Sequence, residues 1–93
     1  MTMGLLTLKL SIAEAQSLKE KRHVLLGFKT RLRSKFNVSV CEADEHDKWQ
    51  VATLAVACVA VDRASVDGLL GRVVEASRRE RELELTDYST ELF

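Results

Sequence analysis

Apolar and more polar side chains alternate along the first stretch of the chain, between Met3 and Ile12. Leucine or isoleucine stands at positions 6, 8, 10 and 12, and Thr7, Lys9 and Ser11 stand between them. A period of two is typical of a β-strand that turns one face to the core. The pattern therefore predicts a strand over Met3–Ile12.

A helical period replaces this alternation after a short connection. Apolar side chains recur there at the spacing of one helix face, namely Leu18, Leu25, Phe28 and Leu32, with Val24 beside them. Ser17-Leu18-Lys19-Glu20 fits a capping box, in which Ser17 Oγ accepts from the N–H of Glu20 and Glu20 reaches back to the N–H of Ser17. We expect a helix from Ser17 to about Ser34 or Lys35. Lys21 projects towards its apolar stripe, so it either snorkels past the end of the sheet or pairs with a carboxylate such as Glu14 or Glu91.

The rest of the chain predicts four further elements. They are a strand over Phe36–Ala43, a second strand over Trp49–Val61 after a polar turn at Glu42–Lys48, a helix from Arg63 to about Arg79 capped by Asp62, and a last strand over Glu82–Phe93. The order strand, helix, strand, strand, helix, strand is that of the ferredoxin-like α+β sandwich. We expect one domain over residues 1–93, with a four-stranded antiparallel sheet, the first and third strands in its middle, and both helices on one face.

Composition narrows the class of protein without naming a partner. Lysine plus arginine and aspartate plus glutamate both number 14, so the formal net charge is zero. No apolar run is long enough for a membrane helix, and the N-terminus lacks the features of a signal peptide. We therefore expect a cytoplasmic protein with no membrane partner.

The arrangement of charge is more informative than its total. The segment from Ser17 to Lys35 holds seven basic residues and one acid, which gives it +6 and leaves −6 for the rest of the chain. On a helix, four of the seven fall in one narrow arc beside the apolar stripe: Lys19, Arg22, Lys29 and Arg33. Such an arc suits the phosphates of a nucleic acid, because neutralising them releases counterions. A solvated helix face or a protein-binding surface would show the same pattern.

The predicted sheet leaves one face without a covering element. The residues expected near its centre are small or apolar: Leu5, Thr53, Ala55, Ala57 and Val59. A homodimer that packs sheet against sheet would cover this face, although scattered alanine and threonine need no partner. None of these residues is aromatic, so the sheet face is unsuited to stacking RNA bases. Any RNA contact would then come from the basic helix and would read phosphates and shape.

Catalytic, metal and cofactor sites find little support. His23 and His46 are the only histidines, and neither has an evident nucleophile partner. The acidic turn around Glu45 matches no calcium loop, since it lacks the turn glycine and the distal glutamate. We expect no enzyme activity, no metal and no cofactor. A small-ligand sensor that uses Lys21, His46 or Trp49 is an alternative.

Several blocks resemble the YlxP-like family of small bacterial proteins. They are SLKEKR (17–22), KFNVSV (35–40), EADEHDKWQVATLAV (42–56) and VDR (61–63). The resemblance implies a ferredoxin-like fold, the bacterial cytoplasm and a genomic neighbourhood of translation and ribosome maturation. It implies no activity, cofactor or catalytic residue. Our leading hypothesis is a non-enzymatic protein that binds rRNA or a ribosomal subunit through the basic arc. The alternatives are a homodimeric interaction module and the ligand sensor.

Overall fold

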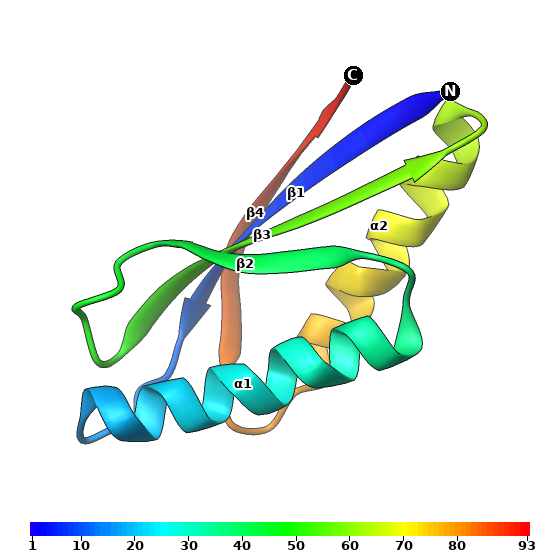
Figure 1. Ribbon diagram of the computed structural model, residues 1–93. Coiled ribbons are helices and arrows are strands. Elements are labelled where there is room, and N and C mark those ends of the chain that lie inside the picture. Colours follow the sequence, from blue (N-terminus) through cyan, green and yellow to red (C-terminus); the bar gives the residue numbers. More distant parts are fainter.

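Six elements make up the computed structural model, which describes residues 1–93. In chain order they are β1 (Thr2–Ser11), α1 (Leu18–Lys35), β2 (Ser39–Asp44), β3 (Val51–Ala60), α2 (Arg63–Arg78) and β4 (Glu84–Leu92). The strands form one antiparallel sheet in the order β2-β3-β1-β4 (Figure 1). The predicted ferredoxin-like fold is confirmed, including the central position of β1 and β3.

One face of the sheet forms the core. Alternate residues of the two central strands are buried there: Leu6, Leu8 and Leu10 from β1, as its period of two predicted, and Ala52, Leu54, Val56 and Cys58 from β3. The helices add Leu25, Phe28 and Leu32 from α1, and Val66, Leu70 and Val73 from α2. The predicted stripe of α1 is thus largely confirmed, but Leu18 is only half-buried.

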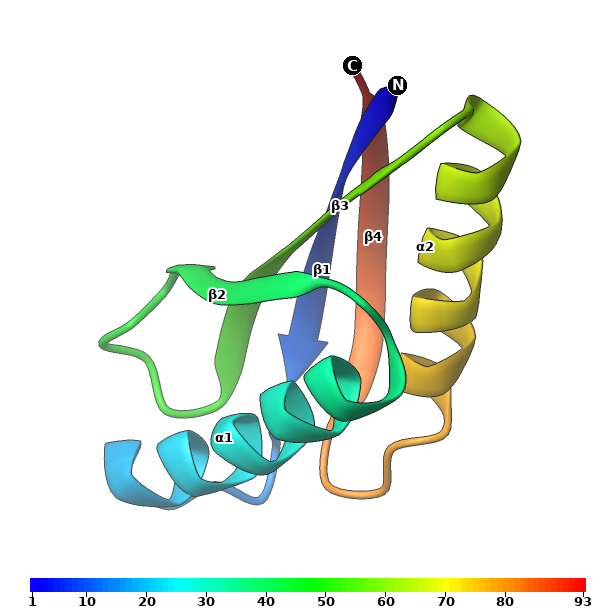
Figure 2. The same ribbon diagram turned by 45° about the vertical axis from the view of Figure 1, so that its right-hand side comes forward.

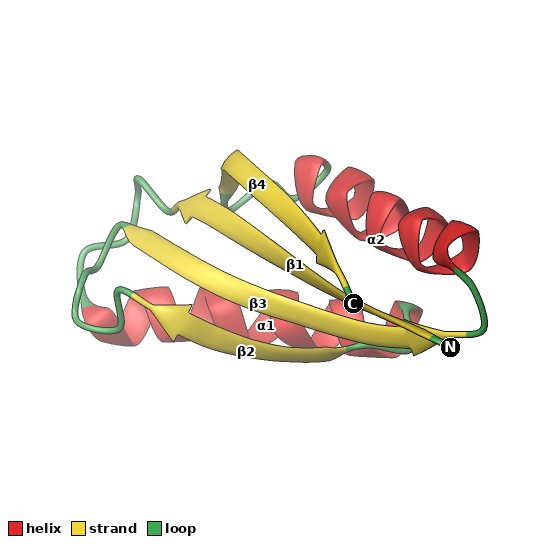
Figure 3. Cartoon of the chain, turned by 90° about the horizontal axis from the view of Figure 1, so that it is seen from above, coloured by secondary structure: helices red, strands yellow, loops and turns green.

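The two helices divide this face between them. Residues of α1 contact β2, whereas α2 contacts β1, β3 and β4. Figure 2 shows α1 crossing one end of the sheet and α2 rising along the other side. Figure 3 shows β2 and β4 at the two edges, with α1 near the first and α2 near the second. Neither helix has the length together with the hydropathy that a membrane crossing needs.

Local hydrogen bonds explain where the elements differ from the prediction. β2 begins three residues later than expected, because the backbone N–H of Phe36 still bonds to Leu32 O at 2.8 Å and ends α1. Ser17 Oγ accepts from the N–H of Glu20 at 3.1 Å, as the capping box predicted. The reciprocal bond is shifted by one residue, since Glu20 Oε2 accepts from Gln16 and not from Ser17.

Candidate nucleic-acid interface

The four residues of the predicted basic arc lie along the side of α1 that borders β2. Lys19, Arg22 and Arg33 are exposed and Lys29 is half-buried. Arg33 shows which side this is, because its Nη2 donates to the backbone carbonyl of Val40 in β2 at 2.8 Å. That bond leaves the positive charge of Arg33 uncompensated. None of the four contacts a carboxylate.

The other cations of α1 are held by groups of the protein itself. Arg31 forms a bidentate pair with Glu80, and this hydrogen bond raises the pKa of Arg31 above its usual value. Lys35 lies over the ring of Phe36, with 5.6 Å between its Nζ and the ring centroid. Lys21 is buried in an ion pair. The seven cations of α1 therefore form two groups: three contact an acidic or aromatic side chain of the protein, and the four of the arc stay available to an external anion.

Lys21 takes one place in the buried stripe of α1, with 1% of its surface exposed. Its Nζ lies 3.0 Å from Glu42 Oε2 and donates to the carbonyl of Glu45 at 2.6 Å. Glu42 Oε2 itself has no partner with hydrogen-bond geometry, so the contact with Lys21 is electrostatic. The expected partners Glu14 and Glu91 are wrong. Lys21 is sealed by the hairpin between β2 and β3 and does not snorkel to solvent.

Polar groups of that hairpin bond to one another instead of converging on a metal. Glu45 has a φ of 64°, and its N–H bonds to Asp44 Oδ1 at 2.8 Å. His46 Nε2 lies 3.0 Å from the carbonyl of Glu42. Thr53 Oγ1 donates to Glu45 Oε2 at 3.3 Å. Apart from Glu42 Oε2, these polar groups of the turn thus bond to one another or to Thr53.

The five residues expected at a sheet-face interface do lie on the open side of the sheet, but they differ in exposure. Val59 and Ala57 are exposed, Leu5 and Ala55 are half-buried, and Thr53 is buried. Lys9 Nζ donates to Thr53 Oγ1 at 3.1 Å, so one end of this face is polar. Among these five residues, the exposed apolar side chains are Ala57 and Val59, at the other end.

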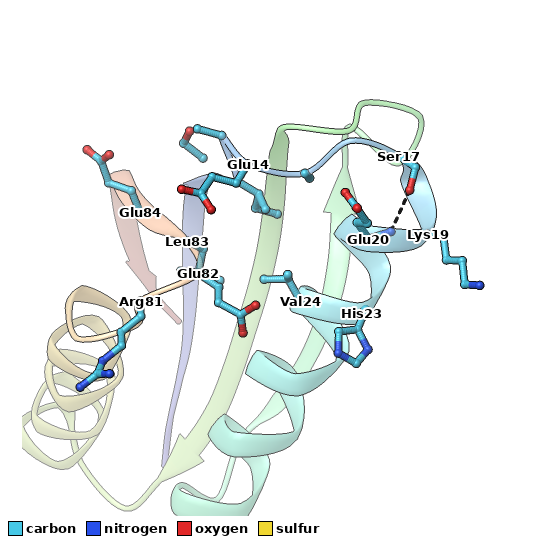
Figure 4. A pocket seen from close by; sticks show the side chains of 14 residues that line it. Glu14, Ser17, Lys19, Glu20, His23, Val24, Arg81, Glu82, Leu83 and Glu84 are labelled. Atoms are coloured by element: carbon cyan, nitrogen blue, oxygen red, sulfur yellow. Dashed lines mark hydrogen bonds between the residues drawn. The ribbon is translucent and has the colours of Figure 1, made fainter.

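A hollow of about 880 Å³ lies where the β1–α1 connection, the start of α1 and the α2–β4 connection meet. Figure 4 shows Glu14 and Glu82 on opposite walls of it, while the side chain of Lys19 points away. Its other carboxylates are Glu20 and Glu84. Lys19 of the basic arc and Arg81 also line the hollow, but its four carboxylates outnumber these two cations and disfavour a phosphate there.

Sequence reasoning missed one residue of the arc. Leu26 lies between the basic side chains at 100° per residue and is 59% exposed. The helical angle is a signal that could have found it. An exposed leucine among cations offers an apolar contact to a sugar or base edge of a ligand whose phosphates the cations hold.

Comparison with known proteins agrees with the resemblance in the sequence blocks. The family model described as "Protein of unknown function (DUF503)" matches residues 3–90. The chain is 40% identical over 82 residues to the "Uncharacterized protein YlxP" of Bacillus subtilis (strain 168), which covers 88% of this chain and 89% of that protein. With nearly the whole domain matched in both comparisons, the chain belongs to the DUF503, or YlxP-like, family.

Proposed function

We propose that the protein binds RNA without catalysis, as a ribosome-associated factor that holds phosphates along the basic arc of α1. One observation carries the proposal: the cations of α1 outside the arc are occupied by Glu42, Glu80 or the Phe36 ring, whereas the four in the arc face no carboxylate. A helix face that is only solvated does not require that its unpaired cations gather on one side.

The shape of the arc sets the kind of recognition. From Lys19 to Arg33 the helix rises about 21 Å at ~1.5 Å per residue. That length spans several phosphates of one RNA strand, and the cations lie on a rigid rod. The arc offers no planar aromatic side chain on which a base could stack. The arc would therefore recognise the phosphate backbone and the shape of a structured rRNA segment rather than its base sequence.

The two alternatives are less well supported. A sheet-face dimer would bury Lys9 and the polar chain that it forms with Thr53 and Glu45. In a ligand sensor Lys21 would have no route to the ligand, because it is enclosed and both of its bonds are internal, and only the other two candidates, His46 and Trp49, are exposed.

Charge reversal in the arc tests the proposal. In the double variant Arg22→Glu, Lys29→Glu, affinity for a fluorescently labelled rRNA hairpin should fall about 100-fold, because two phosphate contacts become repulsive. For the unmodified protein, log affinity against log salt should have a slope of about −3, and the variant should lose about two units of it. Fluorescence polarisation at several salt concentrations measures both quantities.

The matched control carries the same charge change on the other helix. Arg63→Glu with Arg72→Glu alters two exposed arginines of α2 that make no ion pair. This control should keep its RNA affinity to within about threefold, since it touches no phosphate contact. Equal losses in the two double variants, or no loss in the first, would refute the arc as the binding surface.

A further inference from the structure

β4 is an edge strand, and part of its outer backbone has no partner. Met3 and Phe93 exchange two backbone hydrogen bonds, at 3.0 and 2.8 Å, where β1 and the end of β4 meet. Hydrogen-bonded and non-bonded pairs alternate along an antiparallel ladder. It follows that Tyr88, Thr90 and Leu92 direct their N–H and C=O groups away from β1.

One of these outward groups is already used. The N–H of Tyr88 donates to Asp87 Oδ1 at 2.9 Å, and this bond closes the strand edge on its N-terminal side. The carbonyl of Tyr88 and the N–H and carbonyl groups of Thr90 and Leu92 have no protein partner. An edge of this kind is a template for another strand.

The opposite edge of the sheet is built differently. In β2 the outward carbonyl of Val40 accepts from Arg33, and the carbonyl of Glu42 is met by His46 Nε2. Side chains therefore cover the outward carbonyls of β2. The N–H groups of Val40 and Glu42 also face outward and have no protein partner, so β2 is partly covered and β4 is the more open edge.

A shallow groove of about 190 Å³ runs beside the open segment, between β4 and α2. Leu70 and Val74 form its apolar floor next to Tyr88 and Thr90. The space above Gly71 of α2 is open, since a Cβ there would meet nothing within 4 Å. A strand added to β4 would place every second side chain over this groove.

We propose that β4 pairs antiparallel with β4 of a second copy of the chain, with the two-fold axis at Thr90, so that the two sheets become one. Thr90 then exchanges two hydrogen bonds with Thr90 of the second copy. The N–H of Leu92 donates to the carbonyl of Tyr88 on the other copy, and the reverse bond forms by symmetry. The same register sets the Leu92 side chain of one copy over the groove beside Tyr88 of the other.

A two-fold axis at Thr90 makes the edge compatible with a second copy, although β4 carries three carboxylates and no cation. In this register Asp87 lies opposite Phe93 and Glu91 lies opposite Ser89 of the other copy, so no acid faces an acid. The two Glu91 side chains are diagonal neighbours at about 8 Å, where salt screens their repulsion. An axis at Tyr88 would instead run the pairing into the irregularity between Lys9 and Leu10 and displace Asp87 from its bond.

Sedimentation velocity over a range of protein concentrations tests the pairing. The 10.5 kDa chain should approach twice that mass as concentration rises. Thr90→Pro removes an N–H that faces outward, and proline is tolerated on such an edge, so this variant should be folded and monomeric. Thr90→Lys places two like charges across the axis and should weaken dimerisation at least about tenfold.

Two controls separate this interface from other contacts. Ala57→Glu on the open sheet face should leave the dimer intact. Thr90→Cys in a Cys41→Ser background should crosslink on mild oxidation, because residues paired across the axis have Cα atoms about 5.5 Å apart. Ser89→Cys in the same background should not crosslink, since its copies lie about 8 Å apart.

A monomer at all concentrations would overturn the proposal. So would a dimer that Ala57→Glu dissociates and Thr90→Lys leaves unchanged, or crosslinking that is equal for Thr90→Cys and Ser89→Cys. These readouts are independent of RNA binding, because every altered residue lies outside the basic arc. Salt also divides the two proposals: it should weaken RNA binding and leave the dimer unchanged or stronger.

Discussion

Lys21 occupies a position in the buried stripe of α1 that a leucine would ordinarily fill. Its cost of burial is offset by two partners from the hairpin, the Glu42 carboxylate and the Glu45 carbonyl. The carbonyl belongs to a residue at positive φ, which costs energy in a residue other than glycine. Lys21 therefore stabilises both the buried Glu42 carboxylate and the strained turn at Glu45.

Loss of the cation should be costly. In Lys21→Met, Glu42 is left as a largely buried carboxylate without a partner, and the free energy of unfolding should fall by about 2–4 kcal/mol. Adding Glu42→Leu should restore most of it, since a packed apolar pair needs no charge partner. Urea denaturation measures each variant. Arg31→Met, which breaks the half-exposed pair with Glu80, should cost less than about 1 kcal/mol. If both single variants lose the same stability, burial does not set the strength of the Lys21 pair.

Gly4 marks the closest approach of β1 to α2. A Cβ at this position would lie 2.4 Å from Val66 Cγ1 and 2.8 Å from Leu70 Cδ1, so the helix would have to shift. Gly4→Ala should lower stability by about 1–3 kcal/mol in urea denaturation. Gly68→Ala is the control: its nearest contact is the flexible end of Arg72 at 3.5 Å, and it should stabilise α2 by about 0.5–1 kcal/mol. If Gly4→Ala stabilised the protein, α2 would be able to shift away from β1 without a cost in packing.

The arc of Lys19, Arg22, Lys29 and Arg33 followed from helical angles alone, because exposure on a helix is periodic. The partner of Lys21 did not. Glu42 faces inward only through the register of β2, and the register shifts between Glu42 and Asp44. No residue type in the sequence predicts that register shift. Long-range pairs such as Arg31 with Glu80 are hidden for the same reason, since they depend on how two helices cross.

Each helix begins at a side-chain cap. Asp62 accepts from the N–H of Ser65 at 2.8 Å at the start of α2. This bond to the charged carboxylate lowers the pKa of Asp62 below its usual 3.8. The stability that it adds is complete above pH 3.8 and is lost as the pH falls towards the lower pKa of the folded state.

Asp62→Asn removes this titration and keeps a good cap. The difference in Tm between the unmodified protein and this variant should be constant from about pH 7 down to about pH 4, and should then move in favour of the variant. Thermal unfolding followed by circular dichroism across this range is the measurement. A difference that stays constant to about pH 2 would mean that the carboxylate is not favoured by the folded state.

Element type and order were predictable because the periods of the strands and helices are clear. Element ends were less so. Trp49 and Gln50 lie outside β3, where Gln50 instead bonds through its side chain to the carbonyls of Ala13 and Ala15. Such bonds join segments far apart in the chain, so a local pattern gives no warning of them. The open edge of β4 also needed the hydrogen-bond alternation of the whole sheet.

Across the molecule, the blocks that carry the family resemblance meet in space. SLKEKR supplies Lys21 and the first cations of the arc, and the block from Glu42 supplies the hairpin that closes over Lys21. The hairpin thereby fixes the start of the basic helix, while β4 lies at the other edge of the sheet (Figure 3). The proposed RNA surface and the proposed pairing edge are thus on opposite sides of one chain, and neither blocks the other.

The covered carbonyls of β2 limit how many copies of the chain can join into one sheet. A sheet that accepts a neighbour along β4 should stop at two copies, because side chains cover the outward carbonyls of β2 and a further strand could not bond to them. Its mass is then finite at any concentration, whereas a sheet open at both margins would lengthen into fibrils. Arg33 and His46 would in this way act as terminators of polymerisation.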